Sequence, residues 1–153
     1  MIDLQPKKCN LCGGPVEHIS NAEIYGRTYG SGYCYRCRNC DAYVGTHKNR
    51  PKIALGILAD AEMRKMKMKC HDIFDNLWQI KVGNERQHYR QKCYDALANK
   101  LNIDKSACHF GYFDMAMLKQ AYEILISGKL QIILKPDCFR QKEGRYIKSE
   151  QNS

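Results

Sequence analysis

The feature that most constrains the fold of this chain is a pair of Cys-x-x-Cys motifs near its N-terminus. The first motif is Cys9-Asn10-Leu11-Cys12, and the second, Cys37-Arg38-Asn39-Cys40, follows after a spacer of 24 residues. Two such motifs at about this spacing are typical of a tetrahedral zinc site with four thiolate ligands. The predicted ligands of one structural Zn²⁺ are therefore Cys9, Cys12, Cys37 and Cys40.

Four thiolates fill the coordination shell of zinc and leave no position for a water molecule. We therefore predict a structural ion and no catalytic residue at this site. Cys34 forms a second, overlapping pair with Cys37, because the two are also separated by two residues. Two interpretations of Cys34 stay open: it replaces one of the four ligands, or it is a small apolar residue of the zinc-binding part.

The number and placement of the cysteines favour a reducing environment. The chain has 153 residues and nine cysteines, an odd number, and its first residues lack the apolar core of a signal peptide. No stretch approaches the roughly 18 apolar residues that a membrane span requires. We predict a cytoplasmic protein without a membrane role.

The first third of the chain is patterned as short strands and turns. Alternating and β-branched or aromatic residues predict strands at residues 15–19, 23–25, 33–36 and 42–44, and residues 46–51 are predicted to be a basic linker. This part offers little apolar surface for a core, so bound zinc must supply much of its folding free energy. The combination is typical of a zinc ribbon.

Three helices are predicted after the linker. Apolar residues recur every three or four positions between Asp60, a predicted N-cap, and residue 80. Asn84 resembles the cap of a second helix and Asp114 that of a third. The predicted fold class is α+β, with an N-terminal zinc ribbon of β-hairpins in residues 1–50 packed on or linked to a small three-helix part in residues 51–139. Residues 140–153 are a polar tail that is predicted to be disordered.

Several longer stretches of the chain resemble one known family. They are the first cysteine motif, residues 37–45 followed by His47, and residues 58–64, 71–78 and 108–114. With them the chain resembles the zinc-finger-containing domain family of small phage and bacterial proteins, over residues 9 to about 127. The resemblance implies a zinc ribbon fused to helices and a phage or prophage origin, and it implies no particular biochemical activity.

The charge of the chain favours an anionic partner. Lys and Arg number 25 against 16 Asp and Glu, which gives a formal charge of +9 and a pI near 9.1. Basic and aromatic residues alternate around the predicted hairpin, a combination suited to phosphates and to stacked bases. The predicted nucleic-acid-binding residues, for DNA or RNA, are Arg27, Tyr29, Tyr35, Arg36, Arg38, Lys48, Arg64, Lys65 and Lys67. In the competing interpretation, some tyrosines only shield the zinc site and the lysines are the solvated side of a helix.

Two further hypotheses remain open at this level. One is a protein-interaction module that inhibits or modulates a host or defence complex. The other is a metal-dependent nuclease, for which the candidate residues are His47, His71, Asp75 and His109. His71 and Asp75 lie one helical turn apart and can share a face of the helix. In the competing interpretation, the histidines form structural hydrogen bonds between helix and loop, and Asp75 holds an imidazole.

Overall fold

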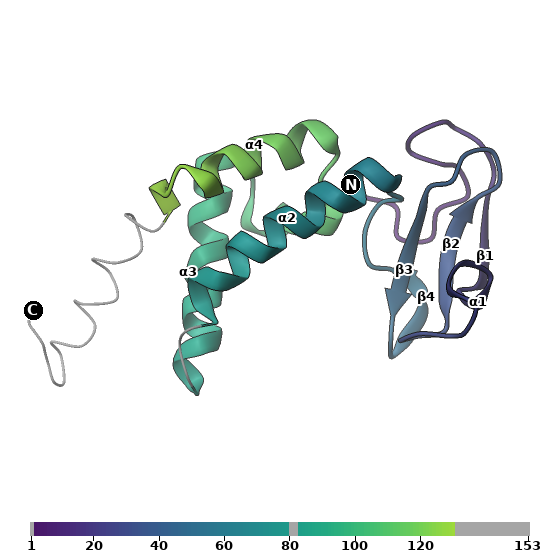
Figure 1. Cartoon of the computed structure of the whole chain (residues 1–153), viewed down its shortest axis with the longest axis horizontal. Coiled ribbons are helices and arrows are strands. Elements are labelled where there is room, and N and C mark those ends of the chain that lie inside the picture. The colour runs from purple at the N-terminus through teal and green to yellow at the C-terminus, as the bar shows by residue number, and fades with distance from the viewer. Residues whose placement is uncertain (1, 80–82, 131–153) are drawn as a thin grey trace, which may run out of the picture. The chain divides into compact units, whose positions relative to one another are not determined.

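A computed structural model describes residues 2–79 and 83–130 of the chain (Figure 1). The chain forms two compact units. Unit 1 comprises the described residues up to Lys67 together with Phe110–Met115, and unit 2 comprises those of Met68–His109 and from Ala116 onward. The predicted tail at residues 140–153 lies outside the described residues.

Unit 1 contains a four-stranded antiparallel sheet in the order β1-β2-β3-β4 (Figure 1). Its strands are Val16–Ser20, Tyr33–Cys37, Tyr43–His47 and Arg50–Ala54. Each strand pairs with its neighbour in the chain, so the sheet is a simple meander. The predicted class is confirmed, since the sheet carries the clustered cysteines and helices follow it: the fold is α+β.

The core of unit 1 lies against one face of this sheet. Because side chains alternate along a strand, Tyr35 and Cys37 of β2 share a face, and the register places Val44 of β3 opposite Tyr35. The Tyr35 hydroxyl donates a hydrogen bond to the carbonyl oxygen of Lys52, at 2.6 Å. The buried core residues are Cys9, Tyr35, Cys37, Ala42, Val44, Ala54 and Leu58.

The predicted strand at residues 23–25 is wrong, because this segment is the one-turn helix α1, Ala22–Tyr25. Asn21 directly precedes the turn, and its side chain bonds both the N–H and the carbonyl of Tyr29, at 3.1 and 2.8 Å. Gly26 ends the helix with a left-handed φ of 83°. Three alternating residues are too few to separate a strand from a helical turn, so the sequence pattern was misleading here.

The predicted basic linker at residues 46–51 is also wrong. His47 pairs with Arg50 across a tight turn, so β3 and β4 form a hairpin with an irregularity between Thr46 and His47. Residue Pro51 lies in this hairpin, although proline has no N–H to donate to a neighbouring strand. Its strand β4 is at the edge of the sheet, where a proline is tolerated.

A close backbone approach joins residues 110–115 to the rest of unit 1. The N–H of Ile57 donates to the carbonyl oxygen of Gly111 at 2.9 Å. A Cβ atom added to Gly56 would lie only 2.0 Å from that same oxygen. Position 56 therefore requires glycine, because no side chain fits between the two backbone segments.

The main helices are α2 (Ala61–Trp78), α3 (Asn84–Leu101) and α4 (Met115–Ile126), with short 3₁₀ turns η1 (Lys105–Ala107) and η2 (Phe110–Tyr112) before α4. The predicted cap of α2 is confirmed, since Asp60 Oδ1 accepts a hydrogen bond from the N–H of Met63 at 2.9 Å. Helix α4 begins directly after Asp114, as predicted. Asn84 is not a cap, because it is the first residue of α3.

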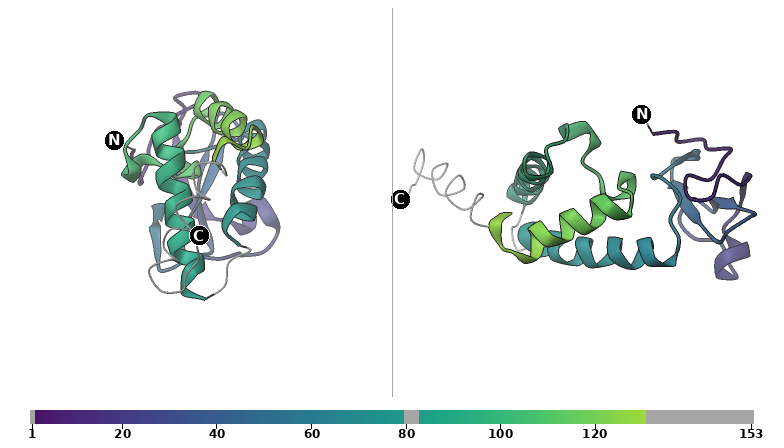
Figure 2. Two further views of the ribbon diagram at one scale, coloured as in Figure 1. Left: turned by 90° about the vertical axis from the view of Figure 1, so that its left-hand side faces the viewer. Right: turned by 90° about the horizontal axis from the view of Figure 1, so that it is seen from above.

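In unit 2, α2 and α4 lie side by side and α3 runs across them (Figure 2). The Cys70 thiol of α2 donates to the carbonyl of Leu118 in α4, with a sulfur–oxygen distance of 3.6 Å. Phe74 of α2 packs on Tyr94 of α3, with ring centroids 4.5 Å apart. None of the helices in residues 2–79 and 83–130 is long and apolar enough to cross a membrane.

The approach of Gly56 to Gly111 yields a stability prediction. We expect Gly56→Ala to lower the free energy of unfolding by about 1–3 kcal/mol, since main-chain atoms must move to admit the methyl group. The measurement is urea unfolding with excess zinc, followed by circular dichroism. Gly45→Ala is the matched control, because its Cβ would meet only Leu55 Cδ1, at 3.5 Å. Equal stability of the two variants would contradict the prediction.

Candidate metal centre and aromatic surface

The first cysteine motif forms a tight turn that directs backbone N–H groups at sulfur. The N–H of Leu11 donates to Cys9 Sγ and the N–H of Gly14 donates to Cys12 Sγ, both at 3.3 Å. A backbone hydrogen bond from the Cys9 N–H to the Gly14 carbonyl, at 2.8 Å, closes the turn. Gly13 adopts a left-handed φ of 78° within it, a conformation that glycine accepts without strain.

The second motif repeats this arrangement at the end of β2. The N–H groups of Asn39 and Cys40 both donate to Cys37 Sγ at 3.3 Å. Gly14 of the first motif lies directly against this turn, because a Cβ atom on it would be 2.5 Å from the Cβ of Asn39. The turn of the first motif therefore packs against the turn of the second, and position 14 between them has no room for a side chain.

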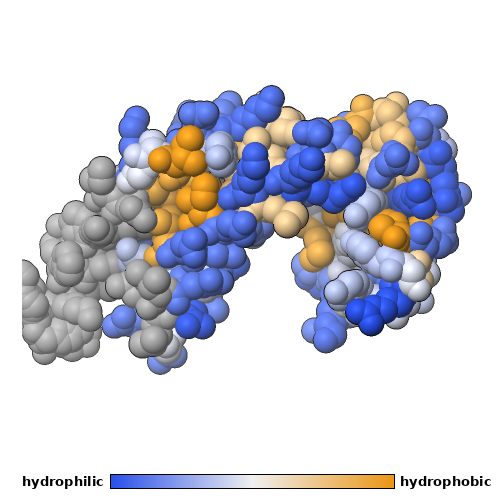
Figure 3. Space-filling view, viewed as in Figure 1, coloured by the Kyte–Doolittle hydropathy of each residue, from blue (hydrophilic) through white to orange (hydrophobic). Residues whose placement is uncertain are grey.

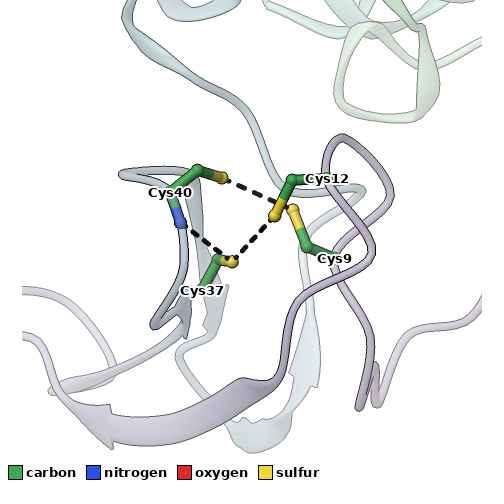
Figure 4. Close-up of side chains that lie close together, drawn as sticks. All are labelled: Cys9, Cys12, Cys37 and Cys40. Atoms are coloured by element: carbon green, nitrogen blue, oxygen red, sulfur yellow. Dashed lines mark hydrogen bonds between the residues drawn. The ribbon is translucent and has the colours of Figure 1, made fainter.

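The four predicted ligands come together in space (Figure 4). All four sulfur atoms lie within 4.8 Å of one another, with Cys9 and Cys40 sulfurs 3.7 Å apart and Cys12 and Cys37 sulfurs 3.4 Å apart. In a zinc tetrahedron with bonds of about 2.3 Å, the sulfur atoms are separated by about 3.8 Å. The cluster therefore fits one structural Zn²⁺. Among the described residues it is the one group of clustered side chains suited to a metal ion.

Asn39 supports the cluster from outside the ligand set. Its side-chain Nδ2 donates to Cys12 Sγ at 3.4 Å. This hydrogen bond, followed by that from the Gly14 N–H, lowers the pKa of Cys12 from the ordinary value of 9.0 to about 6. Donors directed at sulfur favour the thiolate, the form that binds zinc.

Asn10 ties the first motif to the segment that leads into α2. Its Nδ2 donates to the carbonyl of Leu58 at 3.0 Å, and its Oδ1 accepts from the N–H of Leu58 at 2.9 Å. The amide therefore satisfies both backbone groups of a fully buried leucine. Sequence reasoning missed this role, because an asparagine between two cysteines has no pattern that identifies a partner 48 residues away.

Cys34 lies outside the metal cluster. It is three residues before Cys37 on β2, so the two side chains point to opposite faces of the sheet. Cys34 is buried, at 2% exposure, and burial raises the pKa of its thiol. The structure therefore favours the interpretation of Cys34 as a small apolar residue.

The chain belongs to a family of zinc-binding proteins. A family model described as a zinc-finger-containing domain matches residues 5–127, which include both cysteine motifs, the sheet, and α2 to α4. Membership of this family confirms the resemblance drawn from the sequence and agrees with the four-cysteine cluster. Neither a curated protein nor a solved structure matched the chain.

The predicted nucleic-acid-binding residues differ in how accessible they are. Tyr35 is a core residue at 7% exposure, so its ring is not open to a stacked base, and its inclusion was wrong. Arg38 is exposed but lies between Glu17, at 2.7 Å, and Glu23, at 3.6 Å. Arg36 and Lys67 are half-buried, and burial, followed by the charge of Arg64, lowers the pKa of Lys67. Arg27, Tyr29, Lys48 and Lys65 are exposed.

A row of three tyrosines with an arginine at each end lies over the sheet face opposite the core; we call it the tyrosine band. The Arg27 guanidinium lies 5.7 Å from the centre of the Tyr29 ring, and the Arg64 guanidinium lies 4.1 Å from that of Tyr43. Between these ends, Tyr25 meets Tyr29 and Tyr43 edge to face, with centroids 5.5 and 6.3 Å apart. Arg64 also donates to the Ala59 carbonyl, so it holds the band in place.

The tyrosine band is largely uncharged apart from its arginines. Burial, followed by hydrogen bonding with Tyr43, raises the pKa of Tyr25 to about 12, so its hydroxyl carries no charge at neutral pH. On the face of the molecule shown in Figure 3, hydrophilic residues, in blue, are interrupted by patches of hydrophobic residues, in orange.

The residues of the nuclease hypothesis are not among the side chains that cluster as metal ligands in the described part of the chain. His47 belongs to unit 1, whereas His71, Asp75 and His109 belong to unit 2. Asp75 Oδ1 accepts a hydrogen bond from the Trp78 indole at 3.2 Å, and the His109 ring lies near that of Tyr94, with centroids 6.2 Å apart. These contacts agree with a structural role of Asp75 and His109, which form a hydrogen bond and a ring contact, respectively, within unit 2.

The two buried cysteines of β2 provide a matched test of the metal site. We expect Cys37→Ala to abolish stoichiometric zinc binding. The substitution removes a buried ligand, and the three remaining thiolates leave one coordination position of the ion open. Cys34→Ala removes an equally buried thiol, at 2% against 1% exposure, and should retain one zinc per chain. Metal analysis of the purified proteins measures both. Zinc loss in Cys34→Ala alone would contradict the assignment.

Proposed function

We propose that unit 1 is a zinc-stabilised module that binds nucleic acid through the tyrosine band. The observation that carries this proposal is the exposure of large aromatic rings that contact each other on one small surface. Tyr25 and Tyr29 are 48% and 58% exposed, although aromatic rings of this size usually contribute to a core. Such rings beside arginine are the groups that bases stack on.

The charge of unit 1 supports the proposal. Its residues include eleven Lys and Arg against seven Asp and Glu, an excess of four positive charges. Lys48 and Arg50 are exposed at the β3–β4 turn, and Arg27 is exposed at the end of the tyrosine band. Contacts from such side chains to phosphates displace counterions, which makes binding depend strongly on salt.

The zinc site has a supporting role in this proposal. Its four thiolates leave no open coordination position, so the ion contributes folding free energy and no reaction step. The interaction-module hypothesis shares the same surface, and capture of a host protein after nuclease treatment distinguishes it. A phage or prophage origin and a cytoplasmic location stay predictions of the sequence.

Charge reversal at Arg27 tests the proposal. We expect the wild-type chain to bind a labelled 20-nucleotide DNA strand at low salt, with an affinity that falls steeply as salt rises. Arg27→Glu should weaken binding about tenfold and reduce the salt dependence by about one released ion. Fluorescence anisotropy across a salt series measures both quantities.

Lys119→Glu is the matched control, because it makes the same change in net charge at an exposed residue of α4 in unit 2. It should change the affinity by about twofold or less, since Lys119 is not part of the proposed surface and exposed charges outside it are screened by salt. If wild-type binding is absent at low salt, or if both variants lose affinity equally, the proposed surface is wrong.

A further inference from the structure

A hollow of about 320 Å³ opens beside the tyrosine band. It lies within unit 1, between α1 with the loop that follows it and the ends of β3 and β4. Its volume is at the lower end of the range for small-ligand sites. The residues that line it are Asn21, Tyr25, Tyr29, Gly30, Ser31, Tyr33, Gly45, Thr46 and Leu55.

The polar side chains of the hollow already have partners inside the protein. Asn21 bonds both backbone groups of Tyr29, and the hydroxyls of Ser31 and Thr46 bond each other at 2.5 Å and the carbonyl of Tyr33 at 3.2 Å. These bonds fix the loop and occupy its hydrogen-bonding groups. What the hollow offers a ligand is therefore mainly the exposed rings of Tyr25 and Tyr29 and the side chain of Leu55, which is 50% exposed.

The rings are held in place before any ligand arrives. Tyr25 and Tyr29 meet edge to face with centroids 5.5 Å apart, and Asn21 bonds both backbone groups of Tyr29. The Tyr33 ring lies on the opposite face of the sheet, which it shares with Tyr35, and it stacks there on His18 with centroids 5.0 Å apart. Arg27 lies over the Tyr29 ring at the same site and supplies a positive charge.

A planar aromatic ligand that carries a negative charge nearby fits this combination. We propose that the hollow binds an unpaired base of a nucleic-acid strand, stacked on the tyrosines, while Arg27 contacts the adjacent phosphate. Bases inside a duplex are stacked on one another and cannot reach such a site, so the ligand is single-stranded. Because stacking surface dominates over hydrogen-bonding groups, the site tolerates any base. This inference rests on the proposed function and narrows it to one class of ligand.

The test compares three labelled probes of equal length with the wild-type, zinc-loaded chain. They are an oligothymidine, an abasic strand with the same sugars and phosphates, and a blunt DNA duplex. We expect the abasic strand and the duplex each to bind about tenfold or more weakly than oligothymidine at the same salt concentration. The abasic strand keeps its phosphate charges, so the difference reports the base alone.

Tyr29 variants connect this difference to the hollow. Tyr29→Leu should remove most of the preference for oligothymidine over the abasic strand, whereas Tyr29→Phe, which keeps the ring, should retain it. Tyr122→Leu, in unit 2, is the control for loss of a tyrosine elsewhere. One bound zinc per chain and an unchanged circular dichroism spectrum establish that each variant is folded.

The outcomes separate the inference from the proposed function. Equal affinity for oligothymidine and the abasic strand, or tighter binding of the duplex, overturns the base site and leaves electrostatic nucleic-acid binding standing. Absence of binding to all three probes at low salt overturns both. A preference for oligothymidine that survives in Tyr29→Leu assigns base recognition to another surface and overturns the inference.

Discussion

The fold of unit 1 depends on the meeting of four thiolates from two chain segments. Its strands are five residues long, and two of its seven core residues, Cys9 and Cys37, are themselves predicted ligands. Four thiolates within 4.8 Å of one another repel unless a cation lies between them. Bound Zn²⁺ neutralises this repulsion and joins the two chain segments, and the small apolar core can then form around the ion.

The metal site also determines the position of the tyrosine band in unit 1. Pairing of β1 with β2 begins at Val16 and Cys37, next to the two cysteine turns, and continues to Ser20 and Tyr33. A shift of this register by one residue would exchange the two faces of the strands and separate His18 from Tyr33. Ser20 and Tyr33 lie at the other end of this pairing, about 13 Å from Cys37 at roughly 3.3 Å per residue, and the segment between them carries Tyr25 and Tyr29. The proposed binding surface is therefore positioned by the zinc site without being part of it.

The sequence predicted features with local causes and missed those with distant ones. The cysteine spacing, the Asp60 cap and the start of α4 each follow from residues a few positions apart, and they were predicted. The bond of Asn10 to Leu58 and the approach of Gly56 to Gly111 join segments about 50 residues apart, and no local pattern marks them. Alternation placed Tyr33 and Tyr35 on one face but could not show that Tyr35 is covered.

The distribution of the cations determines how nucleic-acid binding would divide between charge and stacking. Arg38 lies between two glutamates and Arg64 is held by Tyr43 and the Ala59 carbonyl, so neither is free to follow a phosphate backbone. The excess of four positive charges in unit 1 therefore overstates the number of phosphate contacts that this unit can make. With few such contacts, electrostatic attraction alone yields weak, salt-sensitive binding. Base stacking at about 1–3 kcal/mol per base then has to supply a large share of the affinity. This is why the abasic strand, more than the salt series, decides what the surface recognises.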